Sequence, residues 1–473
     1  MMRSWTLAQI AKIAGGTLRP PEASVRVRGI STNSRSIQPG ELFIPLRGER
    51  FDGHDFLMEA ARKGAAACLS EELLQGFPVP VVQVKDSLRA LGDLGRAARD
   101  EFAGPLVAIT GSSGKTTTKE MLASILATTG PGLKTAGNFN NLIGVPLTLL
   151  GLESHHSWAV IEMGMNRLGE IAALAAMARP KVGLITNIGT AHLEGLGGIA
   201  GVARAKGELF AGLSAGSTAV VNQDDAQVRV LPVPEGVSVT TYGLSAEAEI
   251  GAENLLADAG TGLGACYRFV LRLGEKKYPV RLNVAGRHNV HNAMAAAAAA
   301  WVLGVKAENI VHGLNRFSPP EGRMQLEQLA PELTLIDDTY NANPDSMRAA
   351  LETLAESEKP GRRYAVLGDM LELGSDSDEL HRQVGRIAAG CTDRLILMGA
   401  KSAQMAAGAK AQGMMESAMD EVETPEEAVR KLRKPLAQGG TVLVKGSRGM
   451  RMERICDLLR ALFGKTIDEA GGH

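Results

Sequence analysis

The sequence LVAITGSSGKTTTKEM occupies residues 106–121 and joins two different hydrophobic patterns. Its first residues, Leu106 to Ile109, form a short continuous apolar run, which is typical of a strand buried on both faces of a parallel sheet. The run ends at Thr110, and apolar residues recur at helical spacing from Met121 onward. We therefore predict a buried strand, a glycine-containing turn and a helix in direct succession.

The turn between this strand and this helix has the composition of a phosphate-binding loop. Its glycines allow backbone N–H groups to approach phosphate oxygens, and the helix N-terminus adds partial positive charge. Lys115 can reach terminal phosphates, and the Thr116 hydroxyl can bind magnesium. The predicted nucleotide-binding residues are Gly111, Ser112, Ser113, Gly114, Lys115, Thr116 and Thr117. The sequence therefore predicts a site for a nucleoside triphosphate.

This loop is shorter than the usual phosphate loop. The usual pattern has a further glycine five positions before the second one, and Ile109 occupies that position here. The alternative interpretation is a Gly/Ser turn that only begins a helix, in a chain with 55 glycines. The buried strand before the turn and the Lys-Thr-Thr-Thr sequence after it favour the phosphate site.

Length and charge limit the other possibilities. A chain of 473 residues exceeds what one hydrophobic core usually serves, so two to three domains are expected. Its 51 basic and 52 acidic residues give a net charge of −1, and aromatic residues make up only 4%. This composition indicates neither a nucleic-acid partner nor attraction to an anionic membrane.

Cysteine spacing and hydropathy indicate the compartment. The four cysteines, at positions 68, 266, 391 and 456, are too far apart for a disulfide framework or a zinc knuckle. The N-terminus has no basic segment followed by an apolar one, and the most apolar run, residues 293–303, is too short to span a membrane. We expect a cytoplasmic protein with no membrane partner.

Residues 1–103 are predicted to form a small α/β domain. Strand-like runs at 25–30, 42–46, 65–69 and 79–84 alternate with helical patterns at 7–14, 55–63 and 87–102. Polar turns between them contain Ser34, Arg35 and His54. Taken alone, these are turn residues, and the local pattern does not indicate a ligand.

Residues 104–317 are predicted to form a doubly wound, mostly parallel sheet. Strand-like runs at 106–110, 158–164, 181–188 and 218–221 alternate with helical patterns, and alternation between 236 and 285 predicts an antiparallel extension. Ligands of such sheets lie at the carboxyl ends of the strands, where Glu162 and His192 occur. Asn289 and Asn292 would share a helix face. Lys206 lies on a helical pattern, and its role stays open at this level.

Residues 318–473, after Pro319-Pro320, are predicted to form a C-terminal Rossmann-like α/β domain. Strand-like runs occur at 333–338, 363–367, 394–398 and 441–445, with helical patterns between them. The fold class is therefore α/β with three domains.

These motifs resemble the Mur ligases, ATP-dependent amide ligases of peptidoglycan precursor synthesis, over essentially the whole chain. The shortened phosphate loop is normal in that family. The matching motifs are TGSSGKTT at 110–117, GNFNN at 137–141 with GVP at 144–146, EMG at 162–164, His192, KGE at 206–208, GRHNVHN at 286–292, Gly322-Arg323 and Asp338.

Further motifs resemble the branch of the family that joins D-alanyl-D-alanine to UDP-N-acetylmuramoyl-tripeptide. They are DTYNANPDSM at 338–347, KGSR at 445–448, Asn33-Ser-Arg35 and Asp52-Gly-His54. Two positions differ from the commoner pattern, with Asn33 in place of Asp and Pro45 in place of Ala.

The resemblance implies roles for individual residues. ATP and Mg²⁺ are the implied cofactors, UDP-N-acetylmuramoyl-tripeptide and D-alanyl-D-alanine the implied partners, and a monomer the expected state. Lys206 would be a carbamylated lysine, which turns a cation into an anion able to lie near magnesium. Implied catalytic residues are Lys115, Lys206, His192 and Arg323; metal ligands are Thr116, Glu162, His192 and Lys206; further ATP contacts are Asn289, Asn292, Arg323 and Asp338; substrate contacts are Ser34, Arg35, His54, Asn138, Asn141, Tyr340, Asn343, Lys445 and Arg448.

Three alternatives remain at this level. A sibling ligase that adds the third amino acid, or a folylpolyglutamate synthase, would keep Lys115 but is not expected to have the Tyr-Asn-Ala-Asn-Pro sequence at 340–344. A nucleotide-dependent switch that hydrolyses ATP without ligation is the third. Whether the tripeptide ends in lysine or diaminopimelate also stays open.

Overall fold

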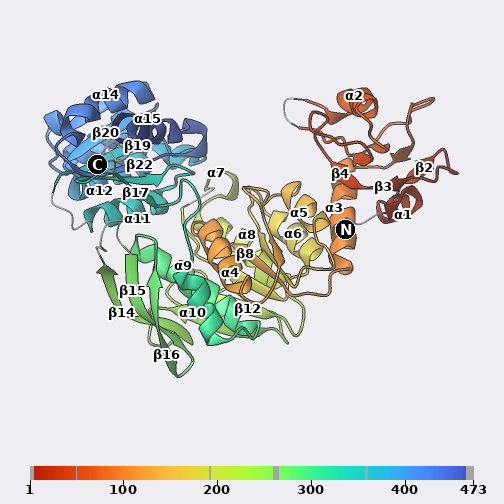
Figure 1. Ribbon diagram of the computed structural model, residues 1–473, viewed down its shortest axis with the longest axis horizontal. Coiled ribbons are helices and arrows are strands. Elements are labelled where there is room, and N and C mark those ends of the chain that lie inside the picture. The colour runs from red at the N-terminus through yellow and green to blue at the C-terminus, as the bar shows by residue number, and fades with distance from the viewer. Residues whose placement is uncertain (1–4, 49–50, 191–192, 259–265, 357–360, 465–473) are drawn as a thin grey trace, which may run out of the picture.

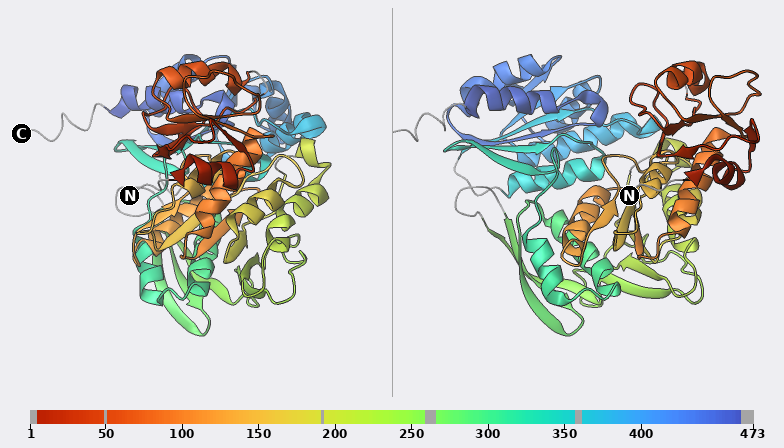
Figure 2. Two further views of the ribbon diagram at one scale, coloured as in Figure 1. Left: turned by 90° about the vertical axis from the view of Figure 1, so that its right-hand side faces the viewer. Right: turned by 45° about the vertical axis from the view of Figure 1, so that its right-hand side comes forward.

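The computed structural model describes residues 5–48, 51–190, 193–258, 266–356 and 361–464. The chain folds into three successive α/β domains, as predicted (Figure 1). The N-terminal and C-terminal domains lie toward the same edge of the central domain in all views (Figures 1 and 2). The predicted boundaries at 103/104 and 317/318 stay predictions.

The N-terminal domain is built on a small sheet with the strand order β2-β7-β6-β5-β4. Its longest helix, α3, begins after Asp86, whose side chain accepts a hydrogen bond from the Arg89 N–H and so caps the helix. This helix packs on α5 of the central domain and connects the two domains (Figure 1). The elements are β1 (Trp5–Thr6), α1 (Leu7–Ile13), β2 (Thr17–Arg19), β3 (Arg26–Val27), β4 (Gly29–Ser31), β5 (Glu41–Phe43), η1 (Gly53–Phe56), α2 (Leu57–Arg62), β6 (Ala67–Ser70), β7 (Val81–Gln83) and α3 (Ser87–Asp100). Helix α5 of the central domain spans Gly144–Leu150.

The central domain contains a sheet with the strand order β16-β15-β14-β13-β12-β11-β8-β10-β9. Strands from β9 to β14 in this order run parallel, and β14, β15 and β16 form an antiparallel extension. The prediction that antiparallel structure begins at residue 236 is wrong for β13, which pairs parallel with both β12 and β14. The elements are β8 (Leu106–Thr110), α4 (Lys115–Leu126), β9 (Gly132–Lys134), β10 (Trp158–Glu162), α6 (Glu170–Ala178), β11 (Val182–Ile185), α7 (Leu193–Leu196), α8 (Ile199–Ala211), β12 (Thr218–Asn222), β13 (Ser238–Gly243), β14 (Ile250–Asp258), β15 (Cys266–Leu273), β16 (Lys276–Leu282), α9 (Arg287–Val302) and α10 (Ala307–Asn315).

The C-terminal domain has a sheet with the strand order β17-β18-β22-β19-β20-β21, parallel except for the edge strand β17. The pairing of β18 with β22 places Asp338 beside Lys445 at the carboxyl ends of both strands. The elements are β17 (Gln325–Ala330), β18 (Leu333–Asp338), α11 (Pro344–Ala355), β19 (Arg363–Gly368), η2 (Gly374–Asp376), α12 (Ser377–Cys391), β20 (Arg394–Met398), α13 (Ser402–Ala411), η3 (Glu416–Ala418), β21 (Met419–Val422), α14 (Pro425–Leu436), β22 (Gly440–Lys445), η4 (Arg448–Met450) and α15 (Glu453–Phe463).

Helix α9 contains the alanine run seen in the sequence. Alanines from Ala293 to Ala300 are fully buried, and the helix packs against α4, several central strands and α11. Apolar contacts therefore continue from the central domain into the C-terminal domain without interruption. None of the described helices is long and apolar enough to cross a membrane.

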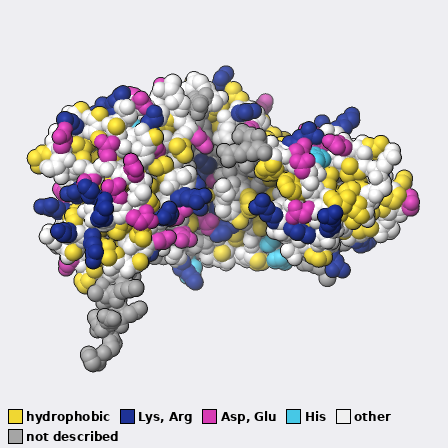
Figure 3. Space-filling model, turned by 90° about the horizontal axis from the view of Figure 1, so that it is seen from above, with side chains coloured by type: hydrophobic (Ala, Val, Ile, Leu, Met, Phe, Trp, Pro, Cys, Tyr) yellow, Lys and Arg dark blue, Asp and Glu magenta, His cyan; other side chains and the backbone are white. Residues whose placement is uncertain are grey.

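The surface carries both signs of charge. On the face seen in Figure 3, Lys and Arg side chains are interspersed with Asp and Glu side chains. This distribution agrees with the net charge of −1.

Candidate active site

A cavity of about 810 Å³ lies between the central and C-terminal domains. The phosphate loop, the carboxyl ends of central strands and the start of α9 line it on one side. The opposite side consists of Arg323, the carboxyl ends of β18 and β22, and the start of α11. The position agrees with the rule that ligands of parallel sheets bind beyond the carboxyl ends of the strands.

Two glycines give the phosphate loop its shape. Gly111 has φ +153°, and a Cβ atom there would lie 1.8 Å from Thr186 Oγ1. Gly114 has φ +77° at the position before α4, and a Cβ atom there would lie 2.3 Å from Asn292 Oδ1. The shortened loop therefore needs glycine at both positions, for conformation and for space.

The loop is fixed by the segment that follows β11. The Ser113 N–H donates to Asn187 Oδ1 at 2.9 Å, and the Thr186 hydroxyl donates to the Ser113 carbonyl at 2.6 Å. Ser112 Oγ accepts from the Gly189 N–H at 2.8 Å. The loop is thus held in one conformation by hydrogen bonds from the segment after β11, which is the preorganisation that binding of phosphate oxygens requires.

Lys115 begins α4 and turns back over the loop. Its ammonium donates to the Gly111 carbonyl at 2.7 Å. Burial lowers the pKa of Lys115, and Arg323 lowers it further, whereas Glu162 raises it. No ion pair within 4 Å joins this ammonium to a residue that the structure describes, so its charge remains available to an anionic ligand.

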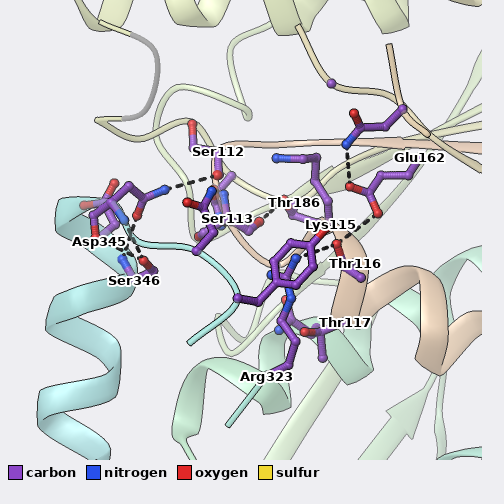
Figure 4. Close-up of a pocket in the computed structure, with 18 of the residues that line it drawn as sticks. Ser112, Ser113, Lys115, Thr116, Thr117, Glu162, Thr186, Arg323, Asp345 and Ser346 are labelled. Carbon is purple, nitrogen blue, oxygen red and sulfur yellow. Dashed lines mark hydrogen bonds between the residues drawn. The ribbon is translucent and has the colours of Figure 1, made fainter. Parts of the chain in front are cut away.

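Thr116 and Glu162 lie next to each other, as the motif predicted. The Thr116 hydroxyl donates to Glu162 Oε2 at 3.0 Å, and Asn140 Nδ2 donates to Oε1 of the same carboxylate at 2.9 Å. Glu162 is 2% exposed at the end of β10. Figure 4 shows both side chains beside Lys115, with Arg323 approaching Thr116 from the C-terminal domain.

Lys119, one helical turn after Lys115, lies behind this carboxylate. It is 1% exposed, donates to the Thr135 carbonyl at 2.8 Å and lies 3.2 Å from Glu120 Oε1 and 3.7 Å from Glu162 Oε2. A buried cation of this kind needs such partners. The sequence pattern had not indicated a role for it.

The C-terminal domain contributes two arginines and an aromatic ring. Arg323 donates to Thr116 Oγ1 at 3.0 Å, and its guanidinium carbon lies 4.0 Å from the centre of the Tyr340 ring. Arg448 lies 5.7 Å from the centre of the same ring. Nε of Arg323 is buried and has no hydrogen-bond partner among the described residues. The guanidinium is therefore oriented from one side and can still donate to a ligand.

Asp338 and Lys445 form a buried ion pair. Lys445 Nζ donates to Asp338 Oδ2 at 2.6 Å and to the Asn341 carbonyl at 2.9 Å, while Asp338 Oδ1 accepts from the Met324 N–H. Asn343 caps α11 and donates weakly to the Ser112 carbonyl, at 3.4 Å. The Tyr-Asn-Ala-Asn-Pro sequence thus crosses from the ion pair to the phosphate loop.

Asn289 and Asn292 meet at the start of α9, as predicted from their spacing. Asn292 Nδ2 donates to Asn289 Oδ1 at 2.9 Å, and both amides are buried in the cavity wall. His288 lies beside them, and burial lowers its pKa to about 4, although Asp338 raises it. This imidazole is therefore neutral at pH 7.

Lys206 is buried in α8, not on a solvated helix face. Burial and the nearby Lys115 lower its pKa well below the usual range. No hydrogen bond or ion pair joins its amine to a residue within the described ranges. His192 lies outside the described residues. No cluster of three or more His, Cys, Asp or Glu side chains suited to a metal occurs in the part of the chain that the structure describes.

The remaining predicted contacts lie nearer the N-terminal domain. Asn138 and Asn141 line the cavity, and Asn141 Oδ1 accepts from the Gly144 N–H at the start of α5. Ser34 and Arg35 lie in a turn of the N-terminal domain, outside the cavity wall.

Both ring nitrogens of His54 form hydrogen bonds within the N-terminal domain. Its Nε2 accepts from the Glu71 N–H at 3.3 Å, so Nδ1 carries the proton and donates to Asp52 Oδ1 at 2.7 Å. The ring therefore orients Asp52.

The cavity wall also contains residues that sequence reasoning did not single out. They include Thr186, Asn187, Asp224 and Tyr242, whereas Asn140, His291 and Asp345 belong to the family motifs at 137–141, 286–292 and 338–347 but had no expected role of their own. His291 Nε2 lies 3.1 Å from Asp224 Oδ2, and this hydrogen bond lowers the pKa of Asp224 to about 2. Thr186 and Asn187 directly follow a buried strand, a position that could have identified them. The others depend on long-range contacts.

Comparison with known proteins gives matches along the chain. Residues 26–99 match the model "Mur ligase family, catalytic domain", residues 109–300 "Mur ligase middle domain", and residues 322–448 "Mur ligase, glutamate ligase domain".

Individual relatives match over nearly their full length. The UDP-N-acetylmuramoyl-tripeptide--D-alanyl-D-alanine ligase of Escherichia coli K12 is 40% identical over 465 residues, covering 97% of this chain and 99% of that protein. A crystal structure of MurF from Acinetobacter baumannii has a TM-score of 0.89 at 35% identity, with 97% and 99% of the two chains covered. MurF ligase from Thermotoga maritima in complex with ADP has a TM-score of 0.83 at 28% identity, with 93% and 98% covered.

Proposed function

The chain belongs to the Mur ligase family, and on that premise we propose that the cavity between its central and C-terminal domains is where it performs its reaction. The chain is an ATP-dependent ligase that adds D-alanyl-D-alanine to UDP-N-acetylmuramoyl-tripeptide in peptidoglycan precursor synthesis. One observation carries the assignment of the cavity: Lys115, Thr116, Glu162 and Arg323, from two domains, converge there.

The proposed reaction has two steps. An oxygen of the tripeptide's terminal carboxylate attacks the γ-phosphorus of ATP, the bond to the bridging oxygen breaks, and ADP leaves from an acyl phosphate. The amino group of the dipeptide then attacks the acyl carbon and loses a proton, and the C–O bond breaks to release inorganic phosphate. Phosphoryl transfer of this kind depends on positioning and charge neutralisation.

The phosphate loop supplies both. The N-terminus of α4, which begins directly after Gly114, would bind phosphate oxygens, and Lys115 would place a positive charge at the terminal phosphates. Arg323, oriented by Thr116 and Tyr340, adds a second cation from the C-terminal domain. Closure of the C-terminal domain against the central domain would exclude water from the acyl phosphate.

The donor set beside Lys115 fits magnesium. Thr116 Oγ1 and the Glu162 carboxylate are hard oxygen donors 3.0 Å apart at the phosphate loop, which is the chemistry that Mg²⁺ prefers. When bound, the ion would neutralise charge on the phosphates. Asn140 and Lys119 hold the Glu162 carboxylate in place for it.

Lys206 fits a carbamylated lysine. Its lowered pKa favours the neutral amine, which is the form that adds to carbon dioxide, and the resulting carbamate would compensate the charge of the nearby Lys115. His192 is proposed as a metal ligand with it.

The roles of the remaining cavity residues follow from the resemblance to the family. We assign Asn289 and Asn292 to the adenine, Arg323 to phosphate and Asp338 to the ribose. Asn138, Asn141, Tyr340, Asn343, Lys445 and Arg448 would contact the reacting peptides. Ser34 and Arg35 would hold the uridine nucleotide on the N-terminal domain, with His54 orienting Asp52 beside it.

The test is ADP release measured against a panel of nucleotide-sugar peptides and amino-acid or dipeptide acceptors, with the product identified by mass. We expect release only when UDP-N-acetylmuramoyl-tripeptide and D-alanyl-D-alanine are both present. Preference for a single amino acid added to a dipeptide precursor, or release without any acceptor, would contradict the proposal.

A further inference from the structure

Asp345, in the first turn of α11, reaches from the C-terminal domain into the central domain. Its Oδ2 accepts from the Thr190 N–H at 2.9 Å and from the Thr190 hydroxyl at 3.2 Å. Figure 4 shows Asp345 beside Ser112 of the phosphate loop.

Both ends of this contact are held in place. Asn343 caps α11 and forms a reciprocal capping box with Ser346, so the turn that carries Asp345 is fixed. On the central side, Gly189 exchanges two hydrogen bonds with Ser112 Oγ, at 2.8 and 3.2 Å. The contact therefore joins α11 to the phosphate loop through one intervening residue.

Gly189 shows that close approach at this point is built into the sequence. A Cβ atom at Gly189 would lie 2.1 Å from Asp345 Oδ2, while its next contacts are at 3.1 Å, to Cγ of the same residue, and at 3.6 Å, to Ser112 Cβ. Gly189 does not have a left-handed φ, so its backbone conformation is open to alanine. The feature that requires glycine here is a carboxylate from the other domain.

We propose that Asp345 is a positioning residue that latches the C-terminal domain to the Gly189–Thr190 segment. The latch holds Arg323 and Tyr340 against the phosphate loop, and in this respect it rests on the proposed function. A carboxylate that accepts two hydrogen bonds forms a strong contact, and it is well solvated again when the domains separate. Such a contact suits a C-terminal domain that closes reversibly on the central domain.

The experiment is a double-mutant cycle in the full-length chain with Asp345→Ala, Gly189→Ala and the pair together. Each single variant should lower kcat/KM for ligation about tenfold to a hundredfold, because charge-assisted hydrogen bonds of this kind contribute that much to an equilibrium. The kcat/KM of the double variant should lie no more than about twofold below that of the more impaired single variant. In the double variant the methyl group added at position 189 no longer meets a carboxylate.

Two further variants separate the latch from a general loss of structure. Thr190→Val removes one donor and keeps the backbone N–H, so its loss should be smaller than that of Asp345→Ala. Asp345→Asn keeps an acceptor and should be intermediate. Circular dichroism melting should remain at the wild-type value in Asp345→Ala, and small-angle X-ray scattering with ADP should give a larger radius of gyration than for the wild type.

Each outcome decides the proposal. Additive losses in the cycle, or an unchanged radius of gyration in Asp345→Ala, would overturn it. If wild-type protein failed to join the two named substrates, the proposed function would fail, but the scattering measurements with ADP would still test the latch. If Gly189→Ala does not fold, the series Asp345→Ala, Asp345→Asn and Thr190→Val must show the stated order of losses, or the latch is refuted.

Discussion

Lys115→Met and Lys119→Met should separate catalysis from stability, although the two lysines are one turn apart on α4. Lys115 faces the cavity and, among the described residues, donates only to the Gly111 carbonyl, whereas Lys119 is buried between two carboxylates. Methionine keeps the length and apolar stem of lysine and removes the charge. The same substitution therefore removes a charge used in catalysis at position 115 and a charge used for stability at position 119.

For Lys115→Met, the activity loss should be large and the stability change small. Removing one preorganised donor from developing negative charge costs about 10²–10³ in kcat, or roughly 2.7–4 kcal/mol. The lost hydrogen bond to Gly111 destabilises the fold, but removal of a partly buried cation, whose pKa burial has lowered, stabilises it. We expect these effects to cancel to within about 1 kcal/mol, roughly 2–4 °C in Tm.

For Lys119→Met, the stability loss should dominate. Removing one partner of a buried ion pair costs about 3–5 kcal/mol. Glu162 keeps its hydrogen bonds from Thr116 and Asn140, so we place the cost near about 3 kcal/mol, or roughly 6–12 °C in Tm. The concentration of Mg²⁺ needed for half-maximal ligation should also rise, because the carboxylate is no longer fixed.

The two variants are compared by urea unfolding without ligands and by steady-state ligation at saturating substrates. Near-wild-type kcat in folded Lys115→Met would refute the role of the phosphate loop. A Lys119→Met protein as stable as Lys115→Met would refute the argument from the buried ion pair.

Three further predictions concern the surrounding residues. Lys206→Ala should lose ligation, and added acetate or formate should partly restore it by supplying the missing negative charge; a complete lack of rescue would count against a carbamate. The free energy of unfolding should fall by about 2 kcal/mol as the pH is lowered from 7.5 to 5, because of His288. The pKa of this imidazole is about 4 in the folded protein and about 6.5 in the unfolded chain, so only the unfolded chain binds a proton in this range. In urea titrations His288→Gln should flatten the pH dependence, and an unchanged slope would contradict this role. Arg323→Lys keeps the charge but loses the stacking on Tyr340 and the donor to Thr116, so kcat/KM should fall about tenfold with little change in Tm; equal activity would show that charge alone suffices.

Local patterns predicted much of the fold. The buried run at β8, the helix that follows it and the doubly wound sheet were read directly from hydrophobic periodicity. Short strands such as β1, β9 and β21 were not predicted, because two to four residues give too little periodicity to distinguish a strand from a turn. Edge strand β17 pairs antiparallel with β18 and was missed for a similar reason, its residues being mostly half-buried.

In the candidate site, too, some residues could be inferred from the local sequence and others could not. Lys115, Thr116 and Glu162 follow buried strands or begin a helix, so their place could be inferred locally. Asp345 and Gly189 could not, because their contact exists only when two domains meet, and nothing in either local sequence reports the other. Lys206 was left open because a helical pattern alone does not reveal which face is buried by a distant element.

The two glycines of the phosphate loop also bear on drug resistance. A ligand seated on the backbone of this loop contacts atoms that almost every amino acid shares, so only a change in loop shape would weaken its binding. At Gly111 and Gly114 a single added methyl group would enter Thr186 or Asn292, and the conformation also disfavours any side chain. An inhibitor that depends on the backbone of this loop therefore leaves few single substitutions that spare the enzyme, whereas one that depends on the exposed Arg448 leaves many.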